Sequence, residues 1–244
     1  MNNRSLFIPV ILGTVRKGRA SENVAKFVFE QVKQREGVET ELIDIRALNF
    51  PGNDAGEQIK DKEFSATCER ADGLVLVVPE YNHGYPGMLK HILDSNLKEY
   101  IHKAVGICGV SAGGFGGTRV IQSLLPVLRE LGLVTIFWDG NFSGAQALFD
   151  EAGNIKDRDT HEKRMDKFLD ELIWMSRVLR YGRESVTMNR PKMVCPDCGA
   201  EMNHHAMKID YSAYEPASID PAFAGVVQEA HTCPECGRTA LRRA

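Results

Sequence analysis

Short apolar runs alternate with amphipathic segments over residues 5–180. Continuous apolar runs such as GLVLVVP at 73–79 predict strands buried on both faces, because a half-exposed strand would alternate apolar and polar residues. Apolar residues at helical spacing, as in 21–35, predict amphipathic helices. The predicted strands are 5–12, 41–46, 73–79, 104–110 and 133–138. The predicted helices are 21–35, 61–71, 86–100, 118–131 and 161–180.

The regular alternation of strands and helices predicts an α/β fold, with a parallel sheet covered by helices on both faces. Five strands favour a doubly wound, flavodoxin-like sheet in the order 2-1-3-4-5. In open sheets of this kind, ligands bind at the carboxyl ends of the strands. A binding site is therefore expected in the loops that follow the strands.

The apolar periodicity ends near Leu179, and the chain changes character afterwards. Residues 180–193 contain Gly, Pro and polar residues without an apolar face, which is typical of a linker. We therefore expect residues 1–180 to form the α/β domain, 181–193 a linker and 194–244 a small second domain. A length of 244 residues suits one large domain with an appendage of this size.

Charge and hydropathy exclude several classes of protein. A net charge of −3 and a pI of about 6.2 disfavour nucleic-acid binding through bulk positive charge. No apolar run reaches the ~20 residues of a membrane span. The N-terminal run SLFIPVILG is too short for the core of a signal peptide. We therefore expect a cytoplasmic protein that has neither a membrane nor a nucleic acid as its partner.

Four of the six cysteines form two Cys-Pro-x-Cys-Gly motifs in the last fifth of the chain. In each motif the Gly permits a tight turn, so that both thiols can reach one ion. Four thiolates favour tetrahedral Zn²⁺, and we expect 194–244 to be a zinc ribbon whose folding depends on the metal. The expected ligands are Cys195, Cys198, Cys233 and Cys236.

Iron in a rubredoxin-like site is the alternative to zinc. The segment 194–244 has only Tyr211, Tyr214 and Phe223 as aromatic residues, whereas a rubredoxin has a dense aromatic core, and this difference favours zinc. A disulfide framework is disfavoured in a chain of this length without a signal peptide. Cys68 and Cys108 fall in predicted buried elements, where we expect them to act as small apolar fillers.

The loop GTVRKGRAS at 13–21 joins the first predicted strand to the first predicted helix. Its hydroxyl groups, its arginine and the backbone N–H groups of a helix N-terminus together favour a bound phosphate. The spacing of Gly13 and Gly18 approaches that of an ATP-binding P-loop. Arg19 and Ala20, however, replace the Lys-Ser/Thr pair that would hold the β- and γ-phosphates and Mg²⁺, so ATP hydrolysis is disfavoured.

Two further loops, PEYNHGYPG at 79–87 and GVSAGGFGG at 109–117, follow the third and fourth predicted strands. The first can present ring edges and backbone N–H groups to a flat polar ligand. The glycines of the second allow positive φ and close approach of the backbone. Together with the phosphate loop, they predict a site for a mononucleotide with a flat ring, such as flavin mononucleotide (FMN).

The loop at 109–117 also contains Gly-x-Ser-x-Gly, which carries the nucleophilic serine in α/β-hydrolases. Ser111, with Asp139 or Asp157 and then His161, would follow the hydrolase order. A nucleophile elbow turns directly into its helix, whereas here residues 114–117 intervene. A serine hydrolase is therefore a weaker alternative.

The three loops resemble those of the NADPH-dependent FMN reductase family, which includes quinone, azo-dye and chromate reductases. The resemblance rests on GTVRKGRASENVA, PEYNHGYPGMLKHILD and GVSAGGFGGTRVIQSLLPVL, and it covers about residues 5–180. It implies a flavodoxin-like fold and bound FMN. It also implies ping-pong hydride transfer from NAD(P)H to a small-molecule acceptor, such as a quinone, an azo dye, chromate or a flavin, and a homodimer or homotetramer.

The family motifs also imply which residues hold the flavin. Thr14 and Arg16 should hold the phosphate with help from Ser21. In the commonest form of the family's loop, Ser-x-Asn follows soon after the arginine; here Arg19 is expected to take the place of Asn23. The residues expected to line the flavin ring are Pro79, Glu80, Tyr81, Asn82, His83, Gly84, Ser111, Gly113 and Gly114.

No side chain is expected to act as a catalyst, because the hydride is exchanged at the flavin N5. The alternative to an enzyme is a flavin-binding electron carrier or redox sensor whose ribbon binds a protein partner. No motif identifies the electron acceptor.

Overall fold

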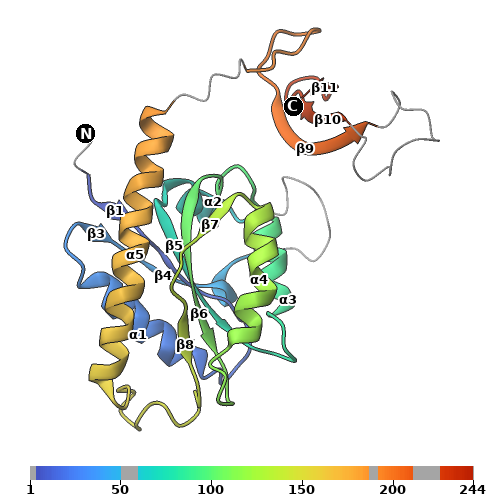
Figure 1. Ribbon diagram of the computed structural model, residues 1–244. Coiled ribbons are helices and arrows are strands. Elements are labelled where there is room, and N and C mark those ends of the chain that lie inside the picture. Colours follow the sequence, from blue (N-terminus) through green and yellow to red (C-terminus); the bar gives the residue numbers. More distant parts are fainter. Residues whose placement is uncertain (1–3, 51–59, 187–191, 211–225, 244) are drawn as a thin grey trace, which may run out of the picture. The chain divides into compact units, whose positions relative to one another are not determined.

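The computed structural model describes residues 4–50, 60–186, 192–210 and 226–243 (Figure 1). The chain divides into two compact units, Met1–Thr187 and Met188–Ala244. None of the helices in the described ranges is long and apolar enough to cross a membrane.

A six-stranded parallel sheet forms the centre of the larger unit, in the order β4-β2-β5-β6-β7, with β8 also paired to β6. Counted by successive strand–helix units, this is the order 2-1-3-4-5, so the predicted flavodoxin-like fold is confirmed. Every residue of the central strands β5 and β6 is buried, as their unbroken apolar sequences predict. The strands are β1 (Leu6–Phe7), β2 (Val10–Leu12), β3 (Val38–Glu39), β4 (Leu42–Asp44), β5 (Gly73–Pro79), β6 (Lys103–Val110), β7 (Leu133–Thr135) and β8 (Gly140–Phe142).

The first and last predicted strands are interrupted in the structure. Around Pro9 the first run divides into β1, which pairs with β3, and β2, which pairs with β4 and β5. The strand predicted at 133–138 ends at Thr135, and the pairing with β6 resumes only in β8. Residues 136–139 face only residues 106–107 of β6, so they bulge outward and leave Phe137 and Trp138 exposed.

Helices cover both faces of the sheet (Figure 1). Helices α1 and α5 share one buried cluster with the sheet, in which Val28 and Phe168 take part. Helices α2, α3 and α4 share the other, through residues such as Phe64, Leu89 and Leu124. The helices are α1 (Ser21–Lys33), α2 (Lys62–Arg70), α3 (Gly87–Asp94), α4 (Thr118–Glu130) and α5 (Arg158–Ser185), with a short 3₁₀ helix, η1 (Ile45–Ala47). Cys68 and Cys108 are fully buried among these clusters, as expected of apolar fillers.

Two helices differ in length from the prediction. The helix predicted at 86–100 ends at Asp94, where local hydrogen bonds compete with the helix: Ser95 Oγ donates to Ile92 O, and Leu97 N donates to Glu99. In contrast, α5 continues through 181–185, which the sequence assigned to the start of the linker at 181–193. Residues 187–191 of that linker lie outside the described residues.

Helix α5 lies directly on the backbone of the sheet at two glycines. A Cβ atom on Gly106 of β6 would overlap the ring of Phe168, and one on Gly73 of β5 would overlap Ser176 Oγ. Because glycine has no side chain, the helix approaches the strands at these two positions more closely than it could if another residue stood there.

The smaller unit contains a three-stranded antiparallel sheet in the order β11-β10-β9. Its strands are β9 (Asn203–Asp210), β10 (Val226–Thr232) and β11 (Thr239–Arg243). The aromatic residues that the sequence analysis weighed, Tyr211, Tyr214 and Phe223, lie outside the described residues.

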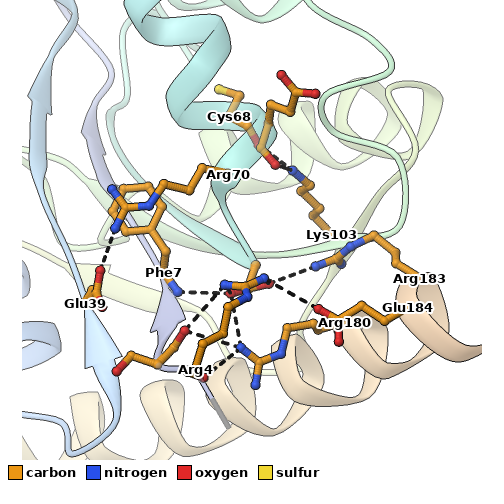
Figure 2. A network of polar contacts seen from close by, with 12 residues as sticks. Arg4, Phe7, Glu39, Cys68, Arg70, Lys103, Arg180, Arg183 and Glu184 are labelled. Carbon is orange, nitrogen blue, oxygen red and sulfur yellow. Dashed lines mark hydrogen bonds and ion pairs between the residues drawn. The ribbon is translucent and has the colours of Figure 1, made fainter. Parts of the chain in front are cut away.

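A buried carboxylate joins three segments at the amino end of the large sheet. Asp72, just before β5, is fully buried and accepts hydrogen bonds from Phe7 N at 3.1 Å, from Arg4 at 2.9 and 3.0 Å, and from Arg183 at 3.1 Å. Arg180 lies 3.6 Å away, and Figure 2 shows the arginines of α5 reaching toward this point. The network explains why α5 extends beyond the predicted end of the helix.

A second buried charge lies beside this network. Lys103 Nζ donates to the carbonyl oxygens of Cys68 and Glu69 at the end of α2, at 2.5 Å each (Figure 2). A cation there is favourable because the last carbonyl groups of a helix carry partial negative charge. Burial, followed by repulsion from Arg183, lowers the pKa of Lys103 to about 8.

Replacing Asp72 with Asn should destabilise the protein by about 3 kcal/mol, because Arg180 and Arg183 would lose a buried countercharge. Urea denaturation followed by circular dichroism measures this loss. The matched control is Arg4→Gln, whose side chain is 43% exposed and which should cost less than about 1 kcal/mol. Equal losses for the two variants would contradict the anchoring role of the carboxylate.

Candidate functional site

A cavity of about 320 Å³ opens at the carboxyl ends of the parallel strands, where the sequence predicts a binding site. Three of its walls are the loops that the sequence singled out, after β2, β5 and β6. A fourth wall is the loop after β8. The lining residues are Arg16, Lys17, Gly18, Arg19, Ala20, Ser21, Pro79, Glu80, Tyr81, Val110, Ser111, Ala112, Ala145 and Gln146.

The loop at 13–21 presents hydrogen-bond donors to one end of the cavity. Ser21 is the first residue of α1; its Oγ is buried and has no hydrogen-bond partner. Arg16 is exposed at the rim, and its guanidinium carbon lies 5.3 Å from the centre of the Tyr81 ring. Thr14 lies buried beneath the loop, 3.3 Å from the Tyr81 hydroxyl, and its Oγ1 accepts a hydrogen bond from Arg16 N at 3.4 Å. A helix N-terminus with these donors suits an anion.

Arg19 is buried and braces the loop from within. Its guanidinium donates to Thr14 O and to the Asp44 carboxylate, and its Nε lies 3.7 Å from Glu22 Oε2. Burial raises the pKa of Asp44, but hydrogen bonds from Arg19 and from Arg46 N outweigh that effect and hold the pKa below its ordinary value. Arg46 also donates to the carbonyl oxygens of Val15 and Arg16 at 3.1 and 2.5 Å. Two arginines thus fix the loop, while Arg16 remains available at the surface.

The loop after β5 contains a tight turn closed by two hydrogen bonds between the backbones of Tyr81 and Gly84, both 2.9 Å. Asn82 and His83 at its tip have φ of 50° and 66°, in the left-handed region that non-glycine residues seldom adopt. Glu80 just before the turn is 9% exposed, with Oε1 3.5 Å from Arg119. Its Oε2 is buried and has no hydrogen-bond partner, so the cavity holds an unused acceptor at this end.

The loop after β6 is held by the last residue of β8 and by the segment that follows β8. Ser111 N donates to Phe142 O at 3.0 Å, and Ala145 N donates to Ser111 O at 3.0 Å. Gly117 has φ of 77°, and a Cβ atom there would come within 2.5 Å of Val110 N, so only glycine fits this turn. The loop therefore packs its backbone tightly at one end and leaves Ser111 on the cavity wall.

The structure does not bring together a hydrolase triad. The hydroxyl group of Ser111 donates to Gly113 O at 2.9 Å. His161 and Asp139 line a different hollow, which does not include Ser111. Asp157 precedes α5 and has no hydrogen bond to His161 through its side chain. The arrangement therefore does not support Ser111 as an activated nucleophile.

The structure places the predicted flavin residues in three groups. Those on the cavity wall are Arg16, Arg19, Ser21, Pro79, Glu80, Tyr81 and Ser111. Thr14 lies beneath the wall. Those outside the lining set are Asn82, His83, Gly84, Gly113 and Gly114. Asn23, whose role the sequence assigned to Arg19, lines another hollow beside α1.

Ala145 and Gln146 on the fourth wall were not predicted from the sequence. They lie in the loop after β8, and no motif marks them. The topology of the sheet could have indicated them. The fifth predicted strand is parallel to the others, so the loop that follows it lies at the same edge of the sheet as the three predicted loops.

In the smaller unit, the four predicted cysteine ligands lie together. Their sulfur atoms are all within 4.8 Å of one another. The distance is 3.6 Å from Cys195 to Cys236, 3.4 Å from Cys198 to Cys233 and 3.9 Å from Cys198 to Cys236. A disulfide would need about 2.05 Å, whereas four sulfurs placed ~2.3 Å from a tetrahedral Zn²⁺ lie about 3.8 Å apart.

The two cysteine motifs adopt the same turn. Gly199 N donates to Cys195 O at 2.9 Å, and Gly237 N donates to Cys233 O at 3.0 Å. Both glycines have φ of 74°, which explains the Gly of each motif. Hydrogen bonds from the amides of Cys236 and Glu235, which outweigh burial, lower the pKa of Cys233 to about 7. At Cys198 and Cys236 an amide hydrogen bond also lowers the pKa, but the neighbouring thiols and burial outweigh it and raise the pKa, to about 12 for Cys198. The amide groups of both turns thus favour the thiolate, the form in which cysteine binds a metal, whereas the crowding of the four thiols opposes it.

Comparison with known proteins agrees with this geometry. An NADPH azoreductase of Bacillus sp. strain OY1-2 is 35% identical over 120 residues, which are 47% of this chain and 64% of the azoreductase, so the chain spans less than two thirds of that protein. A quinone reductase of Pseudomonas putida is 24% identical over 162 residues, or 62% of this chain and 85% of the reductase. The flavoenzyme NAD(P)H:(acceptor) oxidoreductase FerB from Paracoccus denitrificans shares the fold, with a TM-score of 0.60 and 20% identity over 70% of this chain and 98% of FerB.

Residues 7–145 match the family described as NADPH-dependent FMN reductase. The match covers more than half of the chain and includes the loops at 13–21, 79–87 and 109–117, which build the cavity. The chain therefore belongs to the NADPH-dependent FMN reductase family.

Proposed function

We propose that this protein is an FMN-dependent NAD(P)H oxidoreductase that passes electrons to a small-molecule acceptor. One observation carries the proposal: the cavity is lined by a buried donor and a buried acceptor that have no hydrogen-bond partner. The donor is Ser21 Oγ at the N-terminus of α1, and the acceptor is Glu80 Oε2 in the loop after β5. Buried polar atoms without partners are costly in a folded protein, and a ligand that pairs with them removes the cost.

FMN matches these positions chemically. Its phosphate would take the donors of the loop at 13–21, where Arg16 adds a positive charge and the N-terminus of α1 adds its dipole. The flavin ring carries one N–H donor, which Glu80 could accept. The phenol of Tyr81 and the backbone at 110–112 offer flat walls beside it.

When bound, the flavin would supply the hydride chemistry. The protein's own residues bind and orient it. Arg119 lies 3.5 Å from Glu80 and so partly balances the negative charge next to the ring. The backbone hydrogen bonds at Tyr81 and Gly84 hold the tight turn against the cavity, so the ring would meet a rigid wall. No side-chain acid or nucleophile is needed.

Quinones and azo compounds are the acceptor classes that we propose, since the relatives are a quinone reductase and an azoreductase. Chromate or a free flavin could accept electrons in the same way. If NAD(P)H leaves the cavity before the acceptor enters it, the reaction follows a ping-pong mechanism.

If the loop at 13–21 binds the phosphate of FMN, substitutions in it should lower the affinity for FMN. Ser21→Ala should weaken binding about 5-fold and Arg16→Gln about 10-fold or more, because each removes a hydrogen bond to the phosphate, the second one charge-assisted. Titration of FMN fluorescence measures both. Ser123→Ala, which removes a hydroxyl of α4 that donates to Val120 O and does not line the cavity, is the control and should not change the affinity. Unaltered affinity in both loop variants would argue against a phosphate at this end.

Reduction of the bound flavin by NAD(P)H, followed by its reoxidation by an acceptor, distinguishes an enzyme from a flavin-binding electron carrier. Under anaerobic conditions, NADPH or NADH should bleach the absorbance of the bound flavin, and a quinone or azo dye should restore it. Initial rates should give parallel double-reciprocal lines if the mechanism is ping-pong. Tight FMN binding without bleaching by either nicotinamide would instead identify a carrier or redox sensor.

We also propose that Cys195, Cys198, Cys233 and Cys236 hold one structural Zn²⁺. The support is the clustering of the four sulfurs at distances close to those of a tetrahedral site, on two turns of the same form. Four thiolates would fill all positions, which is typical of a structural rather than a catalytic zinc.

Metal analysis should give one zinc per chain, and Cys195→Ser should remove it and unfold the smaller unit, because zinc binding supplies much of the folding free energy of such units. The control Cys68→Ala changes a buried thiol outside the cluster and should leave the zinc content unchanged. Iron with the absorbance of a ferric thiolate site would support the rubredoxin-like alternative.

The remaining expectations are also proposals. The family resemblance implies a homodimer or homotetramer, which sedimentation of the purified protein can test. A cytoplasmic location, and a protein partner for the smaller unit, can be tested by fractionation and by affinity capture with and without residues 188–244.

A further inference from the structure

A second cavity, of about 550 Å³, lies where the bulge before β8 faces the first turns of α5. It shares no lining residue with the flavin cavity. Its size falls within the range of small-molecule sites, ~300–1,000 Å³. The proposed redox activity does not use it.

Aromatic rings form the walls of this cavity. Trp138 is 43% exposed and meets Phe137 edge to face, with ring centres 5.3 Å apart. The His161 ring of α5, which also lines the cavity, stacks on Phe142 at 5.7 Å with only 10° between the planes. Flat walls of this kind favour a flat ligand, because a ring can stack on them or meet them edge to face.

The charged groups of the cavity lack partners among the described residues. Arg164 and Asp139 take part in no hydrogen bond or ion pair there. Lys167 Nζ lies over the Trp138 ring, 5.5 Å from its centre, and has no ion pair among the described residues. His161 lies one turn before Arg164 on α5, and burial, followed by repulsion from Arg164, lowers its pKa. The cavity therefore carries two unpaired cations against one acid.

The interrupted strand creates this arrangement. Gly140 is the first residue of β8, and a Cβ atom there would come within 2.6 Å of Cys108 Sγ, so β8 can return to the sheet only at a glycine. Four residues, 136–139, lie opposite only two residues of β6, so they bulge, and Trp138 lies against Lys167 of α5. The bulge thus opens the sheet edge as a pocket with rigid walls.

We propose that this cavity binds a planar aromatic anion, such as an aromatic carboxylate or sulfonate, with its ring against Trp138 and its charge between Arg164 and Lys167. Stacking and two charge-assisted contacts together favour such a ligand over a neutral or cationic ring.

The two tryptophans of the chain provide a direct test. Trp174→Phe leaves Trp138 as the sole tryptophan, and Trp138→Phe leaves Trp174, which lies on α5 outside the cavity. The full chain, as purified, is titrated with toluene-4-sulfonate while tryptophan emission is followed. We expect a saturable change in the first variant and none in the second.

The preference for a negatively charged ligand is tested with two compounds that share the same ring, one anionic and one neutral. Toluene-4-sulfonate should bind at least 10-fold more tightly than 4-methylbenzyl alcohol, and the double variant Arg164→Gln/Lys167→Gln should abolish this margin. Arg177→Gln, an exposed arginine of α5 outside the cavity, should preserve it.

Four results would overturn the proposal: no saturable change at Trp138, an equal change at Trp174, tighter binding of 4-methylbenzylamine than of the sulfonate, or a self-association in sedimentation that Trp138→Ala disrupts. The last would mean that the aromatic walls belong to an interface between two copies of the chain. None of these readouts depends on flavin turnover, so the outcome is independent of the proposed oxidoreductase activity.

Discussion

The buried carboxylate of Asp72 is the constraint on which the larger unit depends. A charge without access to water must be paired, and this one takes partners from the N-terminal strand and from the end of α5. The carboxylate thereby ties the N-terminal strand and α5 together at the amino end of the sheet. At the carboxyl end, the loops around the cavity leave buried atoms of Ser21 and Glu80 without hydrogen-bond partners. The fold that is anchored at the amino end of its strands therefore presents unpaired polar atoms in the cavity at the carboxyl end.

The parts of this fold that follow from the sequence are those governed by local pattern. The strand at 73–79 is found with its predicted bounds because every residue is apolar and buried. The break in the fifth strand could not be predicted from apolarity, since it depends on pairing with a different strand: β6 pairs with Thr135 and again with Gly140, where a Cβ atom would overlap Cys108 Sγ. In the same way, the length of α5 depends on arginines whose partner is more than a hundred positions away in the chain.

In the two candidate sites too, the features set by neighbouring residues could be predicted, and those set by tertiary contacts could not. The cysteine motifs could be predicted because each turn is built from neighbouring residues. The loops around the cavity could be located from the topology, but the role of Arg19 could not, because its partner Asp44 comes from a different strand. A basic residue in a phosphate loop suggests contact with the phosphate. In the structure this arginine instead shapes the loop, and a different arginine, Arg16, lies at its surface.

The contact of Phe168 with Gly106 has a consequence for how the chain can vary in length. Two side chains of α5, Phe168 and Ser176, fit over glycines of different strands, so the helix has one permitted position along its own axis. A shift by one residue would place other side chains over the bare backbone. Insertions or deletions between β8 and α5 must therefore be absorbed within residues 143–157 and cannot be passed along the helix.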